Sequence, residues 1–433
     1  MVTQASGVRR WGVSLPDVIS RGLAKWATGI VPPAGPQRAM VPSTFVNLLG
    51  NGLFNTASVL YFTLVVHLTA AQVGIGLTIA GMIGLGAGIP SGLLADRYCP
   101  RTVTLATLGV QAVTMSAFLL IHSALIFTLV ACADRAAVSA NNAARGALIA
   151  RVGGENPAAF RAKLRTFGNA GIVFGTLGSG LAVAAGTDAA YRALIIGDAA
   201  SYVVCALFLL RVPNYQPVPK PRRGRRSGAL IDRPFVTFAA LDGAMGLQYQ
   251  AISLMLPIWI ATRTHAPHPT VAAAFAVNAL VCVFLQAHFG ATVSNPREGG
   301  RAFRRAGLLF LISCPLIATS ADLPAALAPL VIVAAVSIHS IGEIWHSSAS
   351  IALGFGLAPE HAQGEYQGVL GLGFDAGQAL APVILTTAFL GLGQSGWVLL
   401  GLFFAGLGWL GPAVAGWAER TPPRPFQGSG SQV

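Results

Sequence analysis

Charged residues are scarce in this 433-residue chain. Asp, Glu, Lys and Arg make up 10% of the sequence, whereas about 25% is usual in a soluble protein. Apolar residues make up 54%. The shortage of charge excludes a water-soluble globular protein, and the abundance of apolar residues predicts a protein embedded in a lipid bilayer.

The chain also lacks the short motifs of several enzyme classes. It contains no Gly-x-Ser-x-Gly, His-Glu-x-x-His or Walker A sequence. Its five cysteines show no Cys-x-x-Cys or other metal-ligand spacing, so we expect them to pack as small apolar residues. We therefore expect neither an enzyme nor a protein that holds a metal or another cofactor.

Long apolar runs occupy most of the sequence. A helix that crosses about 30 Å of hydrocarbon needs about 20 predominantly apolar residues. We predict an all-α polytopic membrane protein with twelve such helices, near residues 43–68, 72–95, 102–122, 125–150, 167–187, 191–211, 235–262, 269–293, 306–321, 325–354, 366–391 and 395–418.

Basic residues are distributed unevenly around these runs. The chain has 28 Lys and Arg residues and a net charge of +13, which in a soluble protein would indicate nucleic-acid binding. If both termini are cytoplasmic, all but four of these residues lie on the cytoplasmic side. The exceptions are Arg192 and Arg263 outside, and Arg135 and Arg145 within the fourth run. Cytoplasmic loops carry such an excess, so we predict cytoplasmic termini and no nucleic-acid partner.

A Pro-rich basic stretch at residues 213–226 divides the chain, because it cannot continue a helix. We predict a cytoplasmic segment at 1–42 with a short interfacial helix at 17–31, and a six-helix bundle at 43–211. A cytoplasmic linker at 212–234, a second six-helix bundle at 235–418 and a cytoplasmic tail at 419–433 would follow.

A charged turn joins the second and third runs. It has the sequence Gly92-x-x-x-Asp96-Arg97, and Arg101 follows it. Glycine permits close approach of two helices, and Asp and Arg can bind helix ends or each other. Such a cluster can hold two parts of a protein together in one conformation and release them in another, so we interpret these four residues as a conformational hinge.

This turn resembles the corresponding loop in the major facilitator superfamily of secondary transporters, and the resemblance extends over residues 43–418. In more detail the chain resembles bacterial 12-span drug/proton antiporters. The resemblance implies two six-helix bundles, a substrate site near the bilayer midplane and alternating access. It also implies a small-molecule substrate and protons as partners, a monomer, and a bacterial cytoplasmic membrane that the chain crosses many times.

Carboxylates within the predicted spans are candidates for proton coupling. Each charge costs at least about 2.5–3.5 kcal/mol at the bilayer centre unless it faces a cavity or a partner. The candidates are Glu343, Asp375, Asp134 and Asp242.

Other polar residues within the spans are candidates for the substrate cavity. They include an amide stripe in the first run and a polar stripe in the fourth. The full set is Asn47, Asn51, Asn55, Arg135, Asn141, Asn142, Arg145, Tyr249, His339, His346 and Gln378.

The tenth run places His339, Glu343 and His346 on one helical face. Three interpretations remain open: a proton or substrate site, a structural hydrogen-bond network, and a metal site, although one helix does not supply a full ligand set.

The fifth run contains Gly171, Gly175, Gly178 and Gly180, close to a glycine motif of exporters in this superfamily, although small-residue helix packing also explains it. We therefore predict proton-coupled export of small amphipathic molecules, with proton-coupled uptake of a small metabolite as the alternative.

Overall fold

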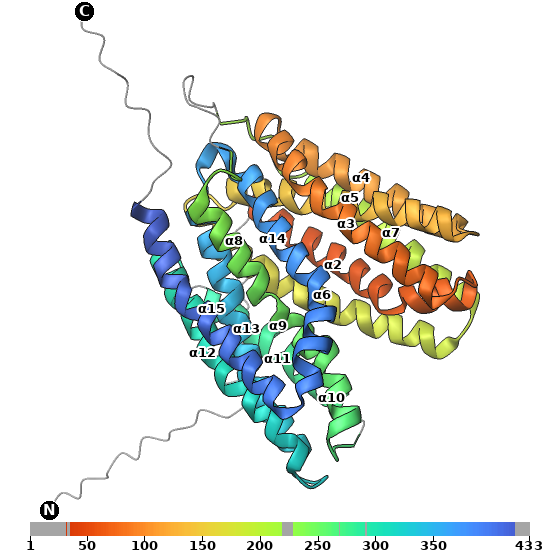
Figure 1. Cartoon of the computed structure of the whole chain (residues 1–433). Coiled ribbons are helices and arrows are strands. Elements are labelled where there is room, and N and C mark those ends of the chain that lie inside the picture. The colour runs from red at the N-terminus through yellow and green to blue at the C-terminus, as the bar shows by residue number, and fades with distance from the viewer. Residues whose placement is uncertain (1–31, 33–34, 219–227, 268, 291, 421–433) are drawn as a thin grey trace, which may run out of the picture.

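The computed structural model describes residues 32, 35–218, 228–267, 269–290 and 292–420 (Figure 1). The predicted interfacial helix at residues 17–31, most of the first segment and the C-terminal tail lie outside the described residues. Every regular element in the described part is a helix, which confirms the predicted all-α class.

Six helical segments form the N-terminal bundle. They are α2 (Pro36–Leu60) with the short helix η1 (Tyr61–Val65), α3 (Ala70–Arg97), α4 (Pro100–Ala117) with η2 (Phe118–Leu120), α5 (Ala124–Val152), α6 (Pro157–Ala185) and α7 (Asp188–Leu209).

Six more form the C-terminal bundle. The first is built from α8 (Arg233–Met245), α9 (Leu247–Gln250), η3 (Ala251–Met255) and α10 (Leu256–Arg263). The others are α11 (Pro269–Gly290), α12 (Pro296–Thr319) with η4 (Ser320–Asp322), α13 (Ala328–Gly356), α14 (Gln363–Val383) with η6 (Ile384–Phe389) and η7 (Leu390–Leu392), and α15 (Gln394–Arg420). The short helix η5 (Glu360–Ala362) precedes α14.

Eleven of these segments, within the described residues, are long and apolar enough to cross a membrane. The twelfth is α2, which carries the amides of Asn47, Asn51 and Asn55. The twelve predicted spans thus correspond to twelve helical segments in two bundles.

Helices α6 and α12 begin about ten residues earlier than predicted. Helix α6 begins at Pro157 instead of residue 167, and α12 begins at Pro296 instead of residue 306. In both, an asparagine caps the N-terminus with its side chain and a proline occupies the first turn: Asn156 accepts from the Ala159 N–H, and Asn295 from the Glu298 N–H. The arginines that we assigned to loops therefore lie inside helices.

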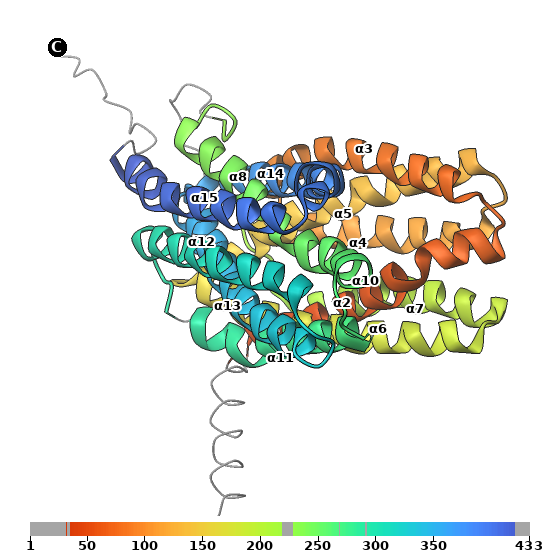
Figure 2. The same cartoon turned by 60° about the horizontal axis from the view of Figure 1, so that its bottom comes forward.

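The two bundles have separate hydrophobic cores. One extends from Met40 to Val212 and includes a few side chains of α13, and the other extends from Ala229 to Ala415. Figures 1 and 2 show the bundles as distinct groups of helices. Each can therefore move as a unit while its own core stays packed.

The bundles contact each other near the linker, at the end where α7 stops and α8 starts, which we call the linker end. Here α3 lies against α14, and a methyl group at Gly92 would overlap the carbonyl oxygen of Gly364. Asp96 accepts hydrogen bonds from the N–H groups of Gly364 (2.8 Å) and Glu365 (2.9 Å). From this end the two bundles diverge (Figure 1).

Candidate functional site

A cavity of about 350 Å³ lies between the two bundles. Its walls come from α2, α3, α5 and α6 on one side and from α8, α9, α13 and α14 on the other. Six of the predicted site residues line it: Asn142, Arg145, Asp242, Tyr249, His346 and Asp375.

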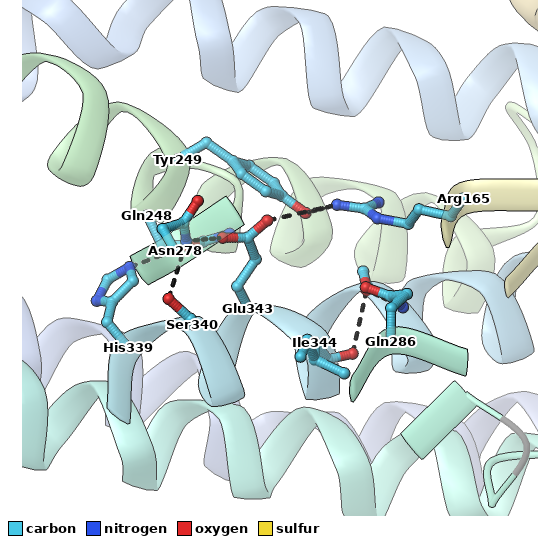
Figure 3. Close-up of polar contacts among 10 residues, drawn as sticks. Arg165, Gln248, Tyr249, Asn278, Gln286, His339, Ser340, Glu343 and Ile344 are labelled. Atoms are coloured by element: carbon cyan, nitrogen blue, oxygen red, sulfur yellow. Dashed lines mark hydrogen bonds and ion pairs between the residues drawn. The ribbon is translucent and has the colours of Figure 1, made fainter. Parts of the chain in front are cut away.

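Arg165 of α6 crosses from one bundle to the other at this cavity (Figure 3). It donates a hydrogen bond to the hydroxyl of Tyr249 (2.7 Å), and its Nη2 lies 3.7 Å from Oε1 of Glu343. The second carboxylate oxygen of Glu343 accepts from the amide of Asn278 (2.9 Å). Glu343 thus links α13 to the opposite bundle through one arginine.

Two further arginines line the same cavity. Arg161 of α6 donates to Oε1 of Gln367 on α14 (2.7 Å), and its guanidinium stacks on Phe355. Arg145 of α5 donates to the hydroxyl of Thr44 on α2 (2.7 Å), so it stays within its own bundle. Arg161 thus forms a second bridge between the bundles, four residues into α6.

Asp242 and His346 form a buried pair at the cavity wall. Nε2 of His346 lies 3.1 Å from Oδ1 of Asp242, and their side chains are 2% and 3% exposed. The two residues come from α13 and α8, so this pair lies within the C-terminal bundle. Nδ1 of His346 has no hydrogen-bond partner among the described residues.

Asp375 of α14 faces the N-terminal bundle. It lines the cavity together with Ser139 of α5. It also interacts electrostatically with Arg135, an exposed residue of α5. Arg135 and the half-buried Gln378 are not among the residues that line the cavity.

Several predicted residues lie elsewhere, because their side chains bond within one bundle. Asp134 accepts from Thr114 of α4 (3.0 Å), and Asn141 donates to Thr107 of α4 (2.8 Å). Asn51 accepts from Tyr202 of α7 (3.2 Å). The residues Asn47 and Asn55 do not line the cavity either.

His339 is fully buried inside the C-terminal bundle and is not among the residues that line the cavity. Its Nε2 lies 3.0 Å from Oε1 of Gln248, and its Nδ1 lies 3.3 Å from the hydroxyl of Ser313. His339, Glu343 and His346 therefore contact three different sets of partners (Figure 3 shows the first two). Among the described residues, no group of three His, Cys, Asp or Glu side chains could hold a metal ion.

Sequence reasoning missed Arg161, Arg165 and Asn278. The two arginines were assigned to a cytoplasmic loop, because the fifth apolar run was predicted to begin only near residue 167. The signal that would have placed them is Asn156-Pro157, a sequence typical of a helix start. From there, Arg161 and Arg165 are spaced i, i+4 and share one face of α6.

The four hinge residues have different roles in the structure. Gly92 and Asp96 contact α14 at the linker end, as described above. Arg101 donates to Oδ1 of Asn214 (2.8 Å) and to the carbonyl of Leu210 (2.9 Å), so it attaches the start of α4 to the end of α7. Arg97 is exposed and stacks on Tyr98.

Comparison with known proteins shows the family. The model of the Major Facilitator Superfamily matches residues 40–382, so the chain belongs to this superfamily of transporters. No curated protein matches the chain.

Solved structures share the fold at low sequence identity. A bacterial homologue of the iron transporter ferroportin, in an outward-facing state, has a TM-score of 0.68 at 12% identity, with 89% of this chain and 99% of that chain covered. The human organic anion transporter MFSD10 (TETRAN) has a TM-score of 0.63 at 15% identity, with 88% and 98% covered. The transporter FucP in its outward conformation has a TM-score of 0.66 at 13% identity, with 88% and 98% covered.

Proposed function

We propose that this member of the major facilitator superfamily is a proton-coupled secondary transporter that moves a small amphipathic molecule by alternating access. The observation that carries the proposal is the Arg165–Glu343 ion pair, which joins the two bundles beside the central cavity. Rocking of the bundles would separate α6 from α13 and leave both charges without a partner. Protonation of Glu343 removes one of these charges, so it lowers the cost of that movement.

The cavity composition supports a substrate that is partly apolar. Side chains such as Leu48, Ile149, Leu164 and Phe374 line it together with the arginines and Tyr249. Transport pockets for small molecules combine an apolar wall with a few polar groups that fix orientation.

The test of proton coupling uses the full chain in liposomes that contain a pH-sensitive dye. Candidate amphipathic compounds are added, and proton movement that depends on a compound identifies one that is carried. Glu343→Gln keeps the shape of the side chain but cannot bind and release a proton, so we expect it to abolish this proton movement. Glu419→Gln is the matched control, because Glu419 pairs with Arg297 at the surface of the C-terminal bundle. Wild-type proton movement in Glu343→Gln would place the proton site elsewhere.

The direction of transport remains a prediction. Export was inferred from four glycines of α6, and in the structure three of them, Gly171, Gly175 and Gly178, pack against α2. Methyl groups at Gly171 and Gly175 would overlap the carbonyl oxygens of Phe45 and Leu49. Close helix packing therefore accounts for the pattern, and uptake stays as the alternative. The same dye experiment distinguishes the two, since export exchanges the compound against protons and uptake carries both in one direction.

A further inference from the structure

Two arginines in the cavity wall have only neutral acceptors among the described residues. Arg145 donates to the hydroxyl of Thr44, and Arg161 to the amide oxygen of Gln367. A guanidinium stays protonated in proteins and cannot lose its charge on burial. Both positive charges therefore remain unneutralised in a part of the molecule where an isolated charge is costly.

The carboxylates near the cavity are already engaged with other side chains. Asp242 pairs with His346, and Glu343 pairs with Arg165. Asp375 interacts with Arg135 on the neighbouring bundle. None of these three forms an ion pair within 4 Å of Arg145 or Arg161 in the described part of the chain.

The arginines also lie close enough to act together. Arg161 is repelled by Arg165 and Arg145 and is attracted more weakly by Asp242. The side chain of Arg165 is 31% exposed although it lies well inside α6, and it lines the cavity, so a ligand can reach it. Its buried Nε has no partner among the described residues. Guanidinium groups bind carboxylates through two parallel hydrogen bonds, and such a pair is stronger than a bond to a neutral acceptor.

We propose that the cavity binds an amphipathic organic anion, with its carboxylate on Arg161 and Arg165 and its apolar part against Leu164 and Phe374. Arg145 of the neighbouring helix α5 adds positive charge to the same wall. This inference names the substrate class of the proposed transporter. Transport of the anion depends on the proposed function, but binding of the anion can be measured without a pH gradient.

Glu343 and the anion would compete for Arg165. The titratable groups around Glu343 are Arg165 of α6, Tyr249 of α9 and Cys282 of α11, with Asp242 and His346 near Tyr249. Protonation of Glu343 removes its negative charge and frees Arg165 for the anion. A proton and an anion therefore bind together, which is the arrangement of co-transport and favours uptake over exchange.

Binding is tested with the purified full chain in nanodiscs of a zwitterionic lipid. The probes are 4-phenylbutanoate, its neutral amide and the cationic 4-phenylbutylammonium, which share one ring and differ in charge. We expect the carboxylate alone to raise the thermal unfolding midpoint in a concentration-dependent manner. Equal stabilisation by the amide or the ammonium compound, or none by the carboxylate, would overturn the proposal.

Variants locate the anion. Arg161→Gln should weaken 4-phenylbutanoate binding at least about tenfold, the size expected for loss of one charge-assisted pair. Arg161→Lys should retain part of the affinity, and this variant keeps the test valid if Arg161→Gln does not fold. Arg263→Gln is the matched control at an exposed position outside the cavity and should bind as the unaltered chain does. Unchanged affinity in both Arg161 variants would contradict the site.

A charge-removing variant tests the competition with Glu343. At about pH 7 the probe is ionised, and Glu343→Gln, which lacks the negative charge that competes for Arg165, should bind it more tightly than the unaltered chain does. Equal or weaker binding by this variant would contradict the competition. Anion binding without gradient-driven transport would overturn only the proposed function, whereas gradient-driven transport of all three probes would overturn only the anion inference.

Discussion

The carboxylates inside the helices of this molecule differ in the partners that their side chains contact. Asp134, Asp242 and Glu343 are all carboxylates inside long apolar helices, yet their partners differ. Asp134 bonds to Thr114 within the N-terminal bundle, Asp242 bonds to His346 within the C-terminal bundle, and Glu343 reaches across to Arg165. A contact between bundles changes during alternating access, whereas a contact within one bundle persists. Of these three carboxylates, Glu343 is therefore the one best placed for coupling.

This difference gives a prediction for Asp134. Asp134→Asn should keep the proton movement of the unaltered chain, because Asp134 does not line the cavity. Loss of its hydrogen bond with Thr114 should lower stability by about 1 kcal/mol, near the values measured for polar contacts between membrane helices. The measurements are dye-reported proton movement in liposomes and the thermal unfolding midpoint. Thr114→Val should cause a similar loss of stability, and abolished proton movement in Asp134→Asn would return Asp134 to the coupling site.

Residue types at the site could be predicted from the sequence, but their partners could not. Helical spacing put His339, Glu343 and His346 on one face, and they do lie along α13. A helix face of about 100° is wide enough to contact several neighbours, so His339 faces α12 and α9 while Glu343 faces the other bundle. Which helices lie next to α13 depends on tertiary packing, and the spacing of polar residues along one helix does not reveal it.

At the level of helices, charge near a helix start misled the sequence interpretation. Arginines in the first three turns of α6 and α12 were assigned to loops, although Asn156-Pro157 and Asn295-Pro296 mark both starts. Apolar runs locate the middle of a membrane helix well, because length and hydropathy decide it. They locate its ends poorly when a polar first turn lies at a cavity or at the membrane surface.

The contact between α3 and the start of α14 gives a second prediction. Asp96 accepts from two N–H groups at the N-terminus of α14, where the helix dipole favours a negative charge by about 0.3–1 kcal/mol. Asp96→Asn removes that charge, so the population with a separated linker end should rise about two- to fivefold. Gly92→Ala should act in the same direction because its methyl group would overlap Gly364.

The measurement is the distance between spin labels attached at Arg97→Cys and Glu360→Cys, both exposed at the linker end, in a chain without its native cysteines. Both variants should increase the fraction of long distances. Asp188→Asn is the control, because Asp188 lies exposed in the first turn of α7 and belongs to one bundle. An unchanged distance distribution in Asp96→Asn and Gly92→Ala would show that this contact does not hold the bundles together.

On the scale of the whole molecule, two separately packed bundles meet at one end and diverge at the other (Figure 1). The division into six and six helices was predictable, because a Pro-rich basic stretch interrupts the apolar runs. The cavity between the bundles was predictable only as a location near the middle. Arg145 was predicted as a cavity residue, whereas Arg161 and Arg165 were not, since both lie near the start of α6 in a stretch that the sequence interpretation placed in a cytoplasmic loop.

The last prediction concerns the orientation of the whole molecule, which rests on the distribution of basic residues. Cys99 lies between α3 and α4 at the linker end, outside the helices, and the other four cysteines lie within them. If the linker end is cytoplasmic, a membrane-impermeant maleimide should label Cys99 only after the cells are permeabilised. His122→Cys, in the exposed turn between η2 and α5, should be labelled in intact cells when Cys99 is replaced by serine.

The pH dependence of this labelling provides an internal check on the Cys99 site. Partial burial acts to raise the pKa of the Cys99 thiol, but hydrogen bonds from Thr102, Arg101 and Tyr215 outweigh it and lower the pKa below its ordinary value. Because the thiolate is the reactive form, a lowered pKa means faster labelling near neutral pH than at His122→Cys in permeabilised cells. Labelling of Cys99 in intact cells, with protection of His122→Cys, would reverse the topology, and the cavity between the diverging bundles would then open to the cytoplasm.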